Sequence, residues 1–291
     1  MKLIVKFNLV FIVVFLLGLA AAGYVSRELL QANARDEIVQ SARLVMESAL
    51  ANRAYTSSQV APLLQTQMKY SFLPQSVPAY SATEVFATLR KTFPDYAYKE
   101  ATLNPTNPRN RASDWEADIV NQFRNAADKP EVIGERDTPS GRSFYIARPM
   151  QIKNEACLAC HSTVDAAPKT LVDRYGPANG FGWKLNEVIG AQIVSVPTDL
   201  PLSRANRAFQ TFMVSLTAVF AFIFIVLNLM LWYMVIRPVT RLSRLADQVS
   251  QGENMDAPDF EVKSGDEIGI LTQSFNRMKK SLVQAMKMLE A

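Results

Sequence analysis

Two long stretches without a charged residue dominate the hydrophobic pattern of the chain. They cover residues 7–26 and 208–236, and both are rich in large apolar side chains. Twenty helical residues rise about 30 Å, which is the thickness of the hydrocarbon core of a bilayer. The pattern therefore predicts two membrane-spanning helices, with Trp232 and Tyr233 near one interface.

The N-terminal stretch has a second interpretation. Lys2 and Lys6 form a basic start, and residues 20–22 are three alanines that resemble a signal-peptide cleavage site. The apolar part is longer than the usual core of about 7–15 residues and leads directly into a helical pattern, which favours an uncleaved anchor.

Basic residues flank the two stretches on the same side. They are Lys2 and Lys6 before the first, and Arg237, Arg241 and Arg244 after the second. The positive-inside rule then places both termini in the cytoplasm and residues 27–207 outside. Arg204 and Arg207 lie on the outer side of the second stretch and weaken this prediction, so the topology needs independent support.

The outer region predicts a helix followed by a small α+β domain. From residue 27 to about 67 apolar positions keep helical spacing, as at Ile38, Ala42, Val45 and Ala49. Strand-like runs lie at 96–102, 131–136, 143–150 and 190–197, with a turn at 139–141, and helical runs lie at 83–93 and 114–123. We expect an antiparallel sheet with helices packed on one face, in a PAS-like arrangement.

Composition narrows the class of protein. The 291 residues allow one to three domains, and 49% hydrophobic with 20% charged residues excludes a disordered chain. The net charge is +4, yet no run of five Lys or Arg occurs, so we expect no nucleic-acid partner.

The two cysteines and the single histidine of the chain share one five-residue window, Cys157-Leu158-Ala159-Cys160-His161. C-x-x-C-H is the attachment signature of c-type haem. Two thiols at this spacing reach the two vinyl groups of one porphyrin, and the adjacent imidazole reaches the iron. We therefore expect haem c, with Cys157 and Cys160 as attachment positions and His161 as the metal ligand.

Three other chemistries use such residues. A structural zinc ion wants four Cys or His ligands, and the chain has three. A redox-active C-x-x-C pair belongs at a helix start in a thioredoxin-like unit, which does not precede Cys157. A plain disulfide leaves the position of His161 unexplained. A c-type haem site also belongs outside the bacterial cytoplasm, in agreement with the predicted topology.

The sixth position on the iron stays open. With one histidine and both thiols in thioether bonds, the ligand has to be Met, Tyr, Lys, water, a gas or a residue of a partner. The methionines of the outer region are Met46, Met68 and Met150, although a methionine is more often a core residue than a ligand.

Weaker candidates could also contact the haem. Trp183, in the run Gly180-Phe181-Gly182-Trp183, could lie against the macrocycle, although a tight turn with a packed Trp explains it as well. Arg148, Arg109 and Arg111 could pair with the propionates, although each could equally be solvated.

The cytoplasmic tail predicts two amphipathic helices. Val239, Leu242, Ala246 and Val249 mark the first, Gly252 ends it, and a connector with Pro258, Phe260 and Val262 follows. The second opens at 265–267 and has a seam of apolar residues: Ile268, Leu271, Phe275, Met278, Leu282, Ala285 and Leu289. Two copies of each helix, from two chains, would form a four-helix bundle; packing of the tail on another domain is the alternative.

The tail resembles the HAMP domain of bacterial receptors over residues 236–288, because Pro238 follows the span and Asp266-Glu267-Ile268-Gly269 opens the second helix. The resemblance implies a homodimer that relays helix displacements to an output module. No kinase, cyclase or methyl-accepting region follows in the sequence, so we expect the output in a separate cytoplasmic protein or in a longer receptor.

The outer region resembles the bacterial c-haem extracytoplasmic PAS-like family, once of unknown function, over about residues 30–200. The segments that carry the resemblance are FPDYAYKEATLNPTNP (93–108), FYIARP (144–149) before the C-x-x-C-H, and GFGW (180–183) through Val196-Pro197. It implies a monohaem sensor fold with Cys157, Cys160 and His161 at the haem.

We therefore expect four parts: an N-terminal anchor (1–26), a periplasmic haem c domain (27–207), a second span (208–236) and a cytoplasmic HAMP domain (237–291). The expected function is a homodimeric inner-membrane receptor that senses redox state or a small gaseous ligand. A membrane-anchored electron-transfer cytochrome is the alternative. An enzyme such as a peroxidase would need a general base near the iron, and a second histidine is absent from the sequence.

Overall fold

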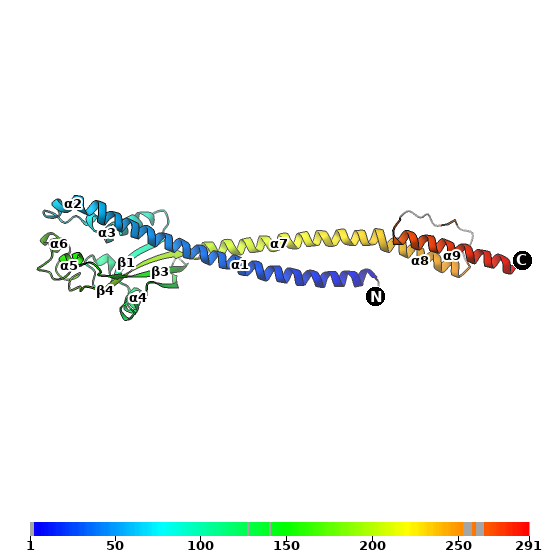
Figure 1. Cartoon of the computed structure of the whole chain (residues 1–291), viewed down its shortest axis with the longest axis horizontal. Helices are drawn as coiled ribbons and strands as arrows, with labels where there is room; N and C mark the ends of the chain where they lie inside the picture. The colour runs from blue at the N-terminus through cyan, green and yellow to red at the C-terminus, as the bar shows by residue number, and fades with distance from the viewer. Residues whose placement is uncertain (1–2, 127, 140, 253–257, 260–264, 291) are drawn as a thin grey trace. The chain divides into compact units, whose positions relative to one another are not determined.

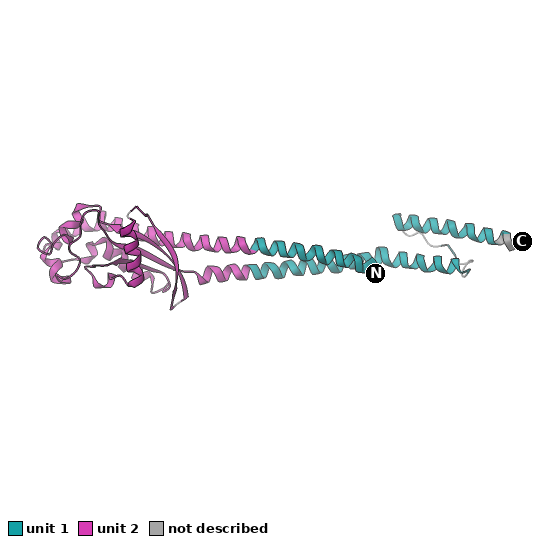
Figure 2. Cartoon of the chain, turned by 90° about the horizontal axis from the view of Figure 1, so that it is seen from below, with its two compact units in different colours: residues 1–26, 209–291 teal, residues 27–208 magenta. Residues whose placement is uncertain are grey.

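A computed structural model describes residues 3–126, 128–139, 141–252, 258–259 and 265–290, with the backbone alone at 287, 289 and 290. Two compact units divide the chain (Figure 2): a sheet unit of residues 27–208, and a span unit of residues 1–26 and 209–291. The expected turn residue Ser140, the connector residues Phe260 and Val262, and the side chain of Leu289 lie outside the described residues.

The described part of the chain contains nine α-helices and four strands (Figure 1). It also contains three short 3₁₀-helices: Pro74–Ser76, Pro108–Asn110 and Glu155–Cys157. The helices are α1 (Leu3–Tyr55), α2 (Ala61–Met68), α3 (Pro78–Leu89), α4 (Asp114–Asn125), α5 (Leu158–His161), α6 (Lys169–Tyr175), α7 (Asp199–Met230), α8 (Arg237–Ser250) and α9 (Glu267–Glu290). The strands are β1 (Ala97–Thr102), β2 (Val132–Thr138), β3 (Gly141–Gln151) and β4 (Val188–Pro197). Single π-helical turns, Thr56–Val60 and Leu231–Ile236, join α1 to α2 and α7 to α8.

The four strands form one antiparallel sheet in the order β1-β4-β3-β2. β4 therefore lies between β1 and β3, and β2 with β3 makes a hairpin. Each strand matches its predicted range within two residues at either end, so the four-stranded antiparallel sheet is confirmed. The long helix after the first span is also confirmed, with the π-helical turn just before Pro62, whose ring nitrogen cannot donate to the helical ladder.

The expectation that helices cover one face of the sheet was wrong. α1 and α3 pack on one face, whereas α4 packs on the other through Ile119, Val120 and Phe123. Along β4, Val194 faces the first cluster and Ile193 the second, and both are buried. A strand with apolar side chains on both faces has to be covered on both faces. The apolar residues at successive positions of β4 are therefore the sequence signal for helices on both sides of the sheet.

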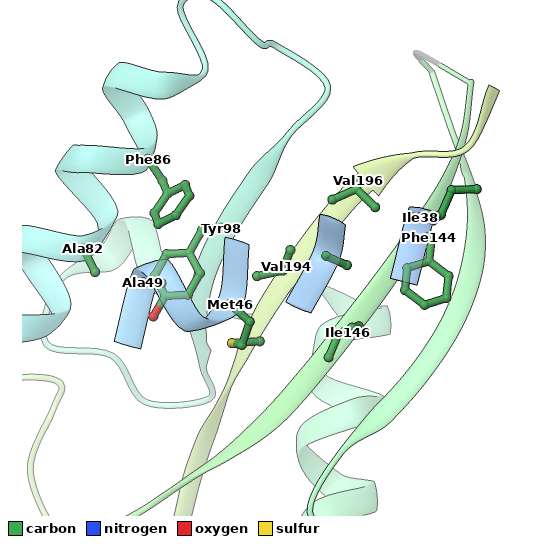
Figure 3. Packing of buried hydrophobic residues seen from close by; sticks show 11 residues of the cluster. Ile38, Met46, Ala49, Ala82, Phe86, Tyr98, Phe144, Ile146, Val194 and Val196 are labelled. Atoms are coloured by element: carbon green, nitrogen blue, oxygen red, sulfur yellow. The ribbon is translucent and has the colours of Figure 1, made fainter. Parts of the chain in front are cut away.

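The face under α1 holds the larger core (Figure 3). Ile38, Ala42 and Ala49 are buried there as predicted, and Met46, rather than Val45, is the fully buried fourth member of the stripe. Tyr98, Phe144, Ile146, Val194 and Val196 supply the sheet side of this cluster. The stripe fixes α1 along the sheet over three to four helical turns.

A buried ion pair lies on the same face of the sheet. Arg53 of α1 donates to both carboxylate oxygens of Glu100 at 2.5 Å, and the Tyr98 hydroxyl donates to Glu100 at 2.7 Å. Burial, followed by the negative charge of Glu100, raises the pKa of Tyr98 far above its ordinary value, so the phenol stays protonated. The pair joins β1 to α1 by a second, polar attachment.

The span unit contains two helices long and apolar enough to cross a membrane, within α1 and within the continuous helix from α7 to α8. They contact one another through aromatic rings, with Phe15 and Phe220 at a centroid distance of 3.8 Å. In the tail, α8 and α9 pack through Leu242, Val249 and Phe275.

We expect Arg53→Ala to lower the free energy of unfolding by about 3 kcal/mol, because it leaves the buried Glu100 carboxylate without its partner. The matched control is Arg43→Ala, which removes an ion pair to Glu131 from an arginine side chain that is 55% exposed and should cost less than about 1 kcal/mol. Thermal unfolding of the full chain in detergent, followed by near-ultraviolet circular dichroism, measures both. Equal losses in the two variants would contradict this view of the Glu100 pair.

Candidate functional site

The C-x-x-C-H sequence forms a single helical turn after β3. The Asn154 side chain accepts a hydrogen bond from the Ala156 amide at 2.9 Å and starts this turn. α5 then carries Cys160 and His161. Residues three and four positions apart lie on one face of a helix, so Cys157, Cys160 and His161 share a face.

The two thiols have different surroundings. Cys157 is exposed, whereas Cys160 is half-buried, and the two are not joined in a disulfide. Cys160 packs on what we call the Phe72 cluster, in which Phe72, Ala167 and Leu171 are buried and Met68, Val77, Cys160, Val172, Tyr175 and Phe181 are partly buried. Burial, with a smaller effect of the neighbouring Cys157, raises the pKa of the Cys160 thiol.

The imidazole of His161 is held in one tautomer. Its Nδ1 lies 2.7 Å from the carbonyl oxygen of Gly180, and a carbonyl only accepts, so Nδ1 carries the proton. Nε2 then keeps its lone pair, the arrangement typical of a metal-binding histidine. Burial lowers the pKa of His161 in spite of this hydrogen bond, so the neutral form that can bind a metal prevails near pH 7.

Trp183 lies directly on this imidazole. The two rings are stacked at 17°, with 4.0 Å between their centroids. The Trp183 amide also donates to the His161 carbonyl oxygen at 3.2 Å. The observed partner of Trp183 is therefore the histidine, and its contact with a macrocycle stays a prediction.

The loop that carries Gly180 is fixed by a side chain that sequence reasoning missed. Asn104 accepts a hydrogen bond from the Gly180 amide and donates to the Phe181 carbonyl oxygen, both at 3.0 Å. Gly180 has a φ of +87°, and a Cβ there would overlap Thr106. Asn104 lies in the segment 93–108 that carried the family resemblance, which is the one sequence signal for it.

The predicted arginines are engaged elsewhere. Arg148 donates to Glu47 of α1 at 2.7 Å and to Glu131 at 3.2 Å. Partial burial opposes its charge, but these two carboxylates raise the pKa of Arg148 overall. The role of Arg148 as a haem contact stays a prediction. In the structure this side chain joins β3 to α1 through Glu47.

The other two arginines lie in the loop before α4. Arg109 pairs with Glu84 and lies over the ring of Tyr80. Arg111 donates to the Asn179 side chain at 3.1 Å, next to Gly180. Arg111 is thus the one of the three whose contact adjoins the histidine loop.

The donor set fits a metal that brings its own ring of ligands. In the described part of the chain, no group of three or more His, Cys, Asp or Glu side chains could hold a metal ion. A metal at Nε2 of His161 therefore needs further ligands from elsewhere, and a porphyrin supplies four.

The sequence profile of the Tll0287-like family matches residues 31–197, which is more than half of the chain. The chain belongs to the Tll0287-like family. A HAMP domain profile matches residues 230–284 of this Tll0287-like chain, so both resemblances seen in the sequence are confirmed. No curated protein sequence matches it at a significant level.

One solved structure, titled "Crystal structure of the cyanobacterial heme-protein Tll0287", resembles this Tll0287-like chain at 15% sequence identity with a TM-score of 0.44. The matched region covers 55% of this chain and 95% of that one.

We expect Gly180→Ala in the Tll0287-like chain to displace the loop and break the His161 hydrogen bond, because its Cβ meets Thr106. Gly182→Ala is the matched control: its φ is +81°, but a Cβ there meets nothing within 4 Å, so only a backbone cost of about 1–2 kcal/mol applies.

The imidazole ¹⁵N signals measure this effect in the full chain without a histidine tag. Because His161 is the sole histidine of the sequence, they need no assignment. Retention of the Nδ1-protonated tautomer in Gly180→Ala would contradict the proposed support of the ring.

Proposed function

We propose that the chain is a homodimeric receptor of the bacterial inner membrane that binds haem c in its periplasmic domain and senses redox state or a small gaseous ligand. The observation that carries the proposal is the His161 imidazole, neutral and held through Nδ1, on the same helical turn as Cys157 and Cys160. The Tll0287-like and HAMP matches support a membrane sensor.

The residues of the site have separate roles in this proposal. Cys157 and Cys160 would each form a thioether to the porphyrin, and Nε2 of His161 would bind the iron. Trp183 and the Gly180 carbonyl hold the imidazole ring, which limits its rotation when the charge nearby changes. The bound haem would supply a one-electron redox couple and one further coordination position.

A single residue joins the last strand of the sheet to α7. Thr198 is the single residue between β4 and α7, is 1% exposed, and makes two hydrogen bonds to the Arg142 carbonyl oxygen. β4 is one of the two inner strands of the sheet, so a displacement of the sheet would reach the start of α7 through it. α1 provides the second connection, through the Arg53 to Glu100 ion pair and the buried stripe.

Apolar side chains of the tail support a homodimer. Leu242, Val249 and Phe275 are buried between α8 and α9. Four large apolar side chains of the predicted seams are exposed in one chain: Val239, Leu271, Met278 and Leu282. A second copy would cover them in a four-helix bundle, the arrangement through which helix displacements could reach a separate cytoplasmic output protein.

The alternative is a membrane-anchored monohaem c-type cytochrome that transfers electrons. It would use the same haem site. The HAMP match over residues 230–284 favours the receptor, because an electron carrier needs no paired helices beyond its second span.

Covalent haem is the first test. We expect the chain, expressed with c-haem maturation machinery, to gain the mass of one haem and to stain for haem after denaturation. The double variant Cys157→Ala/Cys160→Ala should gain neither, whereas Ser162→Ala, next to the motif, should behave like the wild type. A wild-type chain without the added mass would refute the proposal.

Signal relay is the second test. We expect reduction of the haem in the full chain in nanodiscs to change the distance between gadolinium labels attached to Gln273→Cys on the two copies. In the haem-loaded chain both native thiols are in thioethers, so the label attaches to the introduced thiol alone. The same labels in the haem-free double variant are the control and should not respond.

An unchanged distance in the loaded chain would favour the electron carrier. The same measurement also reports on the oligomeric state, because a monomer gives no distance between copies.

A further inference from the structure

The three methionines of the sheet unit lie in different surroundings. Met46 is fully buried between α1 and the sheet, where its sulfur is enclosed by the core. Met150 is the last residue but one of β3, and its methyl group lies beside Gly190 of β4. Met68, the last residue of α2, belongs to the Phe72 cluster together with Cys160.

Two members of the Phe72 cluster are sequence neighbours of the histidine and of the residue that holds it. Its member Cys160 precedes His161 in sequence, and its member Phe181 follows Gly180, which accepts the imidazole hydrogen bond. The Thr170 hydroxyl donates to the Met68 carbonyl oxygen at 3.2 Å and ties the end of α2 to α6. Figure 1 shows α2, α5 and α6 at the same end of the sheet unit.

The Met68 sulfur is held in place but keeps a lone pair. The Leu73 amide donates to Sδ at 3.1 Å. The Ser76 hydroxyl lies 3.4 Å from Sδ but 2.8 Å from the Leu73 carbonyl oxygen, and its single proton goes to the shorter contact. A thioether sulfur has two lone pairs, so one is engaged by the amide and one is left for a metal.

We propose that Met68 supplies the sixth ligand of the iron, opposite His161. This assignment rests on the proposed function, because it needs the haem to be attached at Cys157 and Cys160. A thioether suits the apolar Phe72 cluster, since it is neutral and loses little on leaving water. Methionine opposite histidine is a stable pair on haem iron and raises its potential. With the Met68 thioether bound, the iron would report its redox state, and a gas would have to displace this thioether before it binds.

Tyr175 is the competing side chain of the same cluster. Its ring packs edge-on against Phe72 at 5.7 Å, and the Arg174 guanidinium lies over it. A phenol binds iron as the phenolate, which brings a charge into an apolar site, so the neutral sulfur is favoured.

The test compares the haem-loaded full chain in detergent with Met68→Leu, and with Met150→Leu as the matched control. We expect the oxidised wild type to show the far-red charge-transfer band of a methionine-bound haem. Met68→Leu should lose this band, lower the reduction potential, and bind carbon monoxide about tenfold or more tightly in the ferrous form. Met150→Leu should change none of these.

Met68→His shows whether a change of spectrum comes from the ligand or from a loss of folding. Because the chain has one native histidine, this variant should gain the electron paramagnetic resonance signature of a bis-imidazole haem. Tyr175→Phe tests the competitor and should leave the wild-type spectrum intact.

The outcomes separate this assignment from the proposed function. Haem attached by mass, with an unchanged spectrum in Met68→Leu, overturns the role of Met68 alone, and a change confined to Tyr175→Phe assigns the ligand to the phenol. A chain that carries no covalent haem overturns both proposals.

Discussion

The apolar stripe of α1 against the sheet is the contact on which the rest of the sheet unit depends. Four side chains at helical spacing, Ile38, Ala42, Met46 and Ala49, are buried there at 4% exposure or less. The stripe closes one face of the sheet, while α4 closes the other, so the central strand β4 is enclosed. That packing also brings Arg53 to Glu100 and Glu47 to Arg148, because polar partners can pair only where the helix is already in place.

The histidine site depends on this sheet indirectly. β3 delivers the chain to α5, and the stretch before β4 contains Gly180 and Trp183, which contact the imidazole together with Thr106. Asn104 follows β1, which pairs with β4, and holds the Gly180 loop through its side-chain hydrogen bonds. Three strands therefore contribute to the position of one ring, although none of them carries a ligand.

Much of this architecture is readable in the sequence. The strands follow from short runs between turn residues, and the outer part of α1, from residue 27 on, follows from its helical spacing without glycine. The short helices α5 and α6 were missed because four and seven residues are too few to show a helical period. The start of α3 was placed too late, since Pro78 reads as a loop residue although it suits the first turn of a helix.

The candidate site divides in the same way. The sequence alone identifies Cys157, Cys160 and His161 as candidate site residues, because all cysteines and histidines of the chain lie in one five-residue window. The Gly180 carbonyl could not be found, since a backbone oxygen has no distinctive pattern, and Asn104 is marked only by its place in the segment 93–108. Arg148 was placed at the haem on charge alone, and its carboxylate partners come from residues 47 and 131, far apart in sequence.

The π-helical turn Leu231–Ile236 has a geometric consequence for the tail. A π turn holds one residue more than an α turn, and each residue in an α-helix advances the side-chain direction by about 100°. The azimuth of the Leu242 and Val249 stripe is thus set by this extra residue. Conversion of the turn to regular α-helix would rotate that stripe about the helix axis through a comparable angle, with no change of sequence. A change of hydrogen bonding at the end of the second span would thus be converted into rotation of α8.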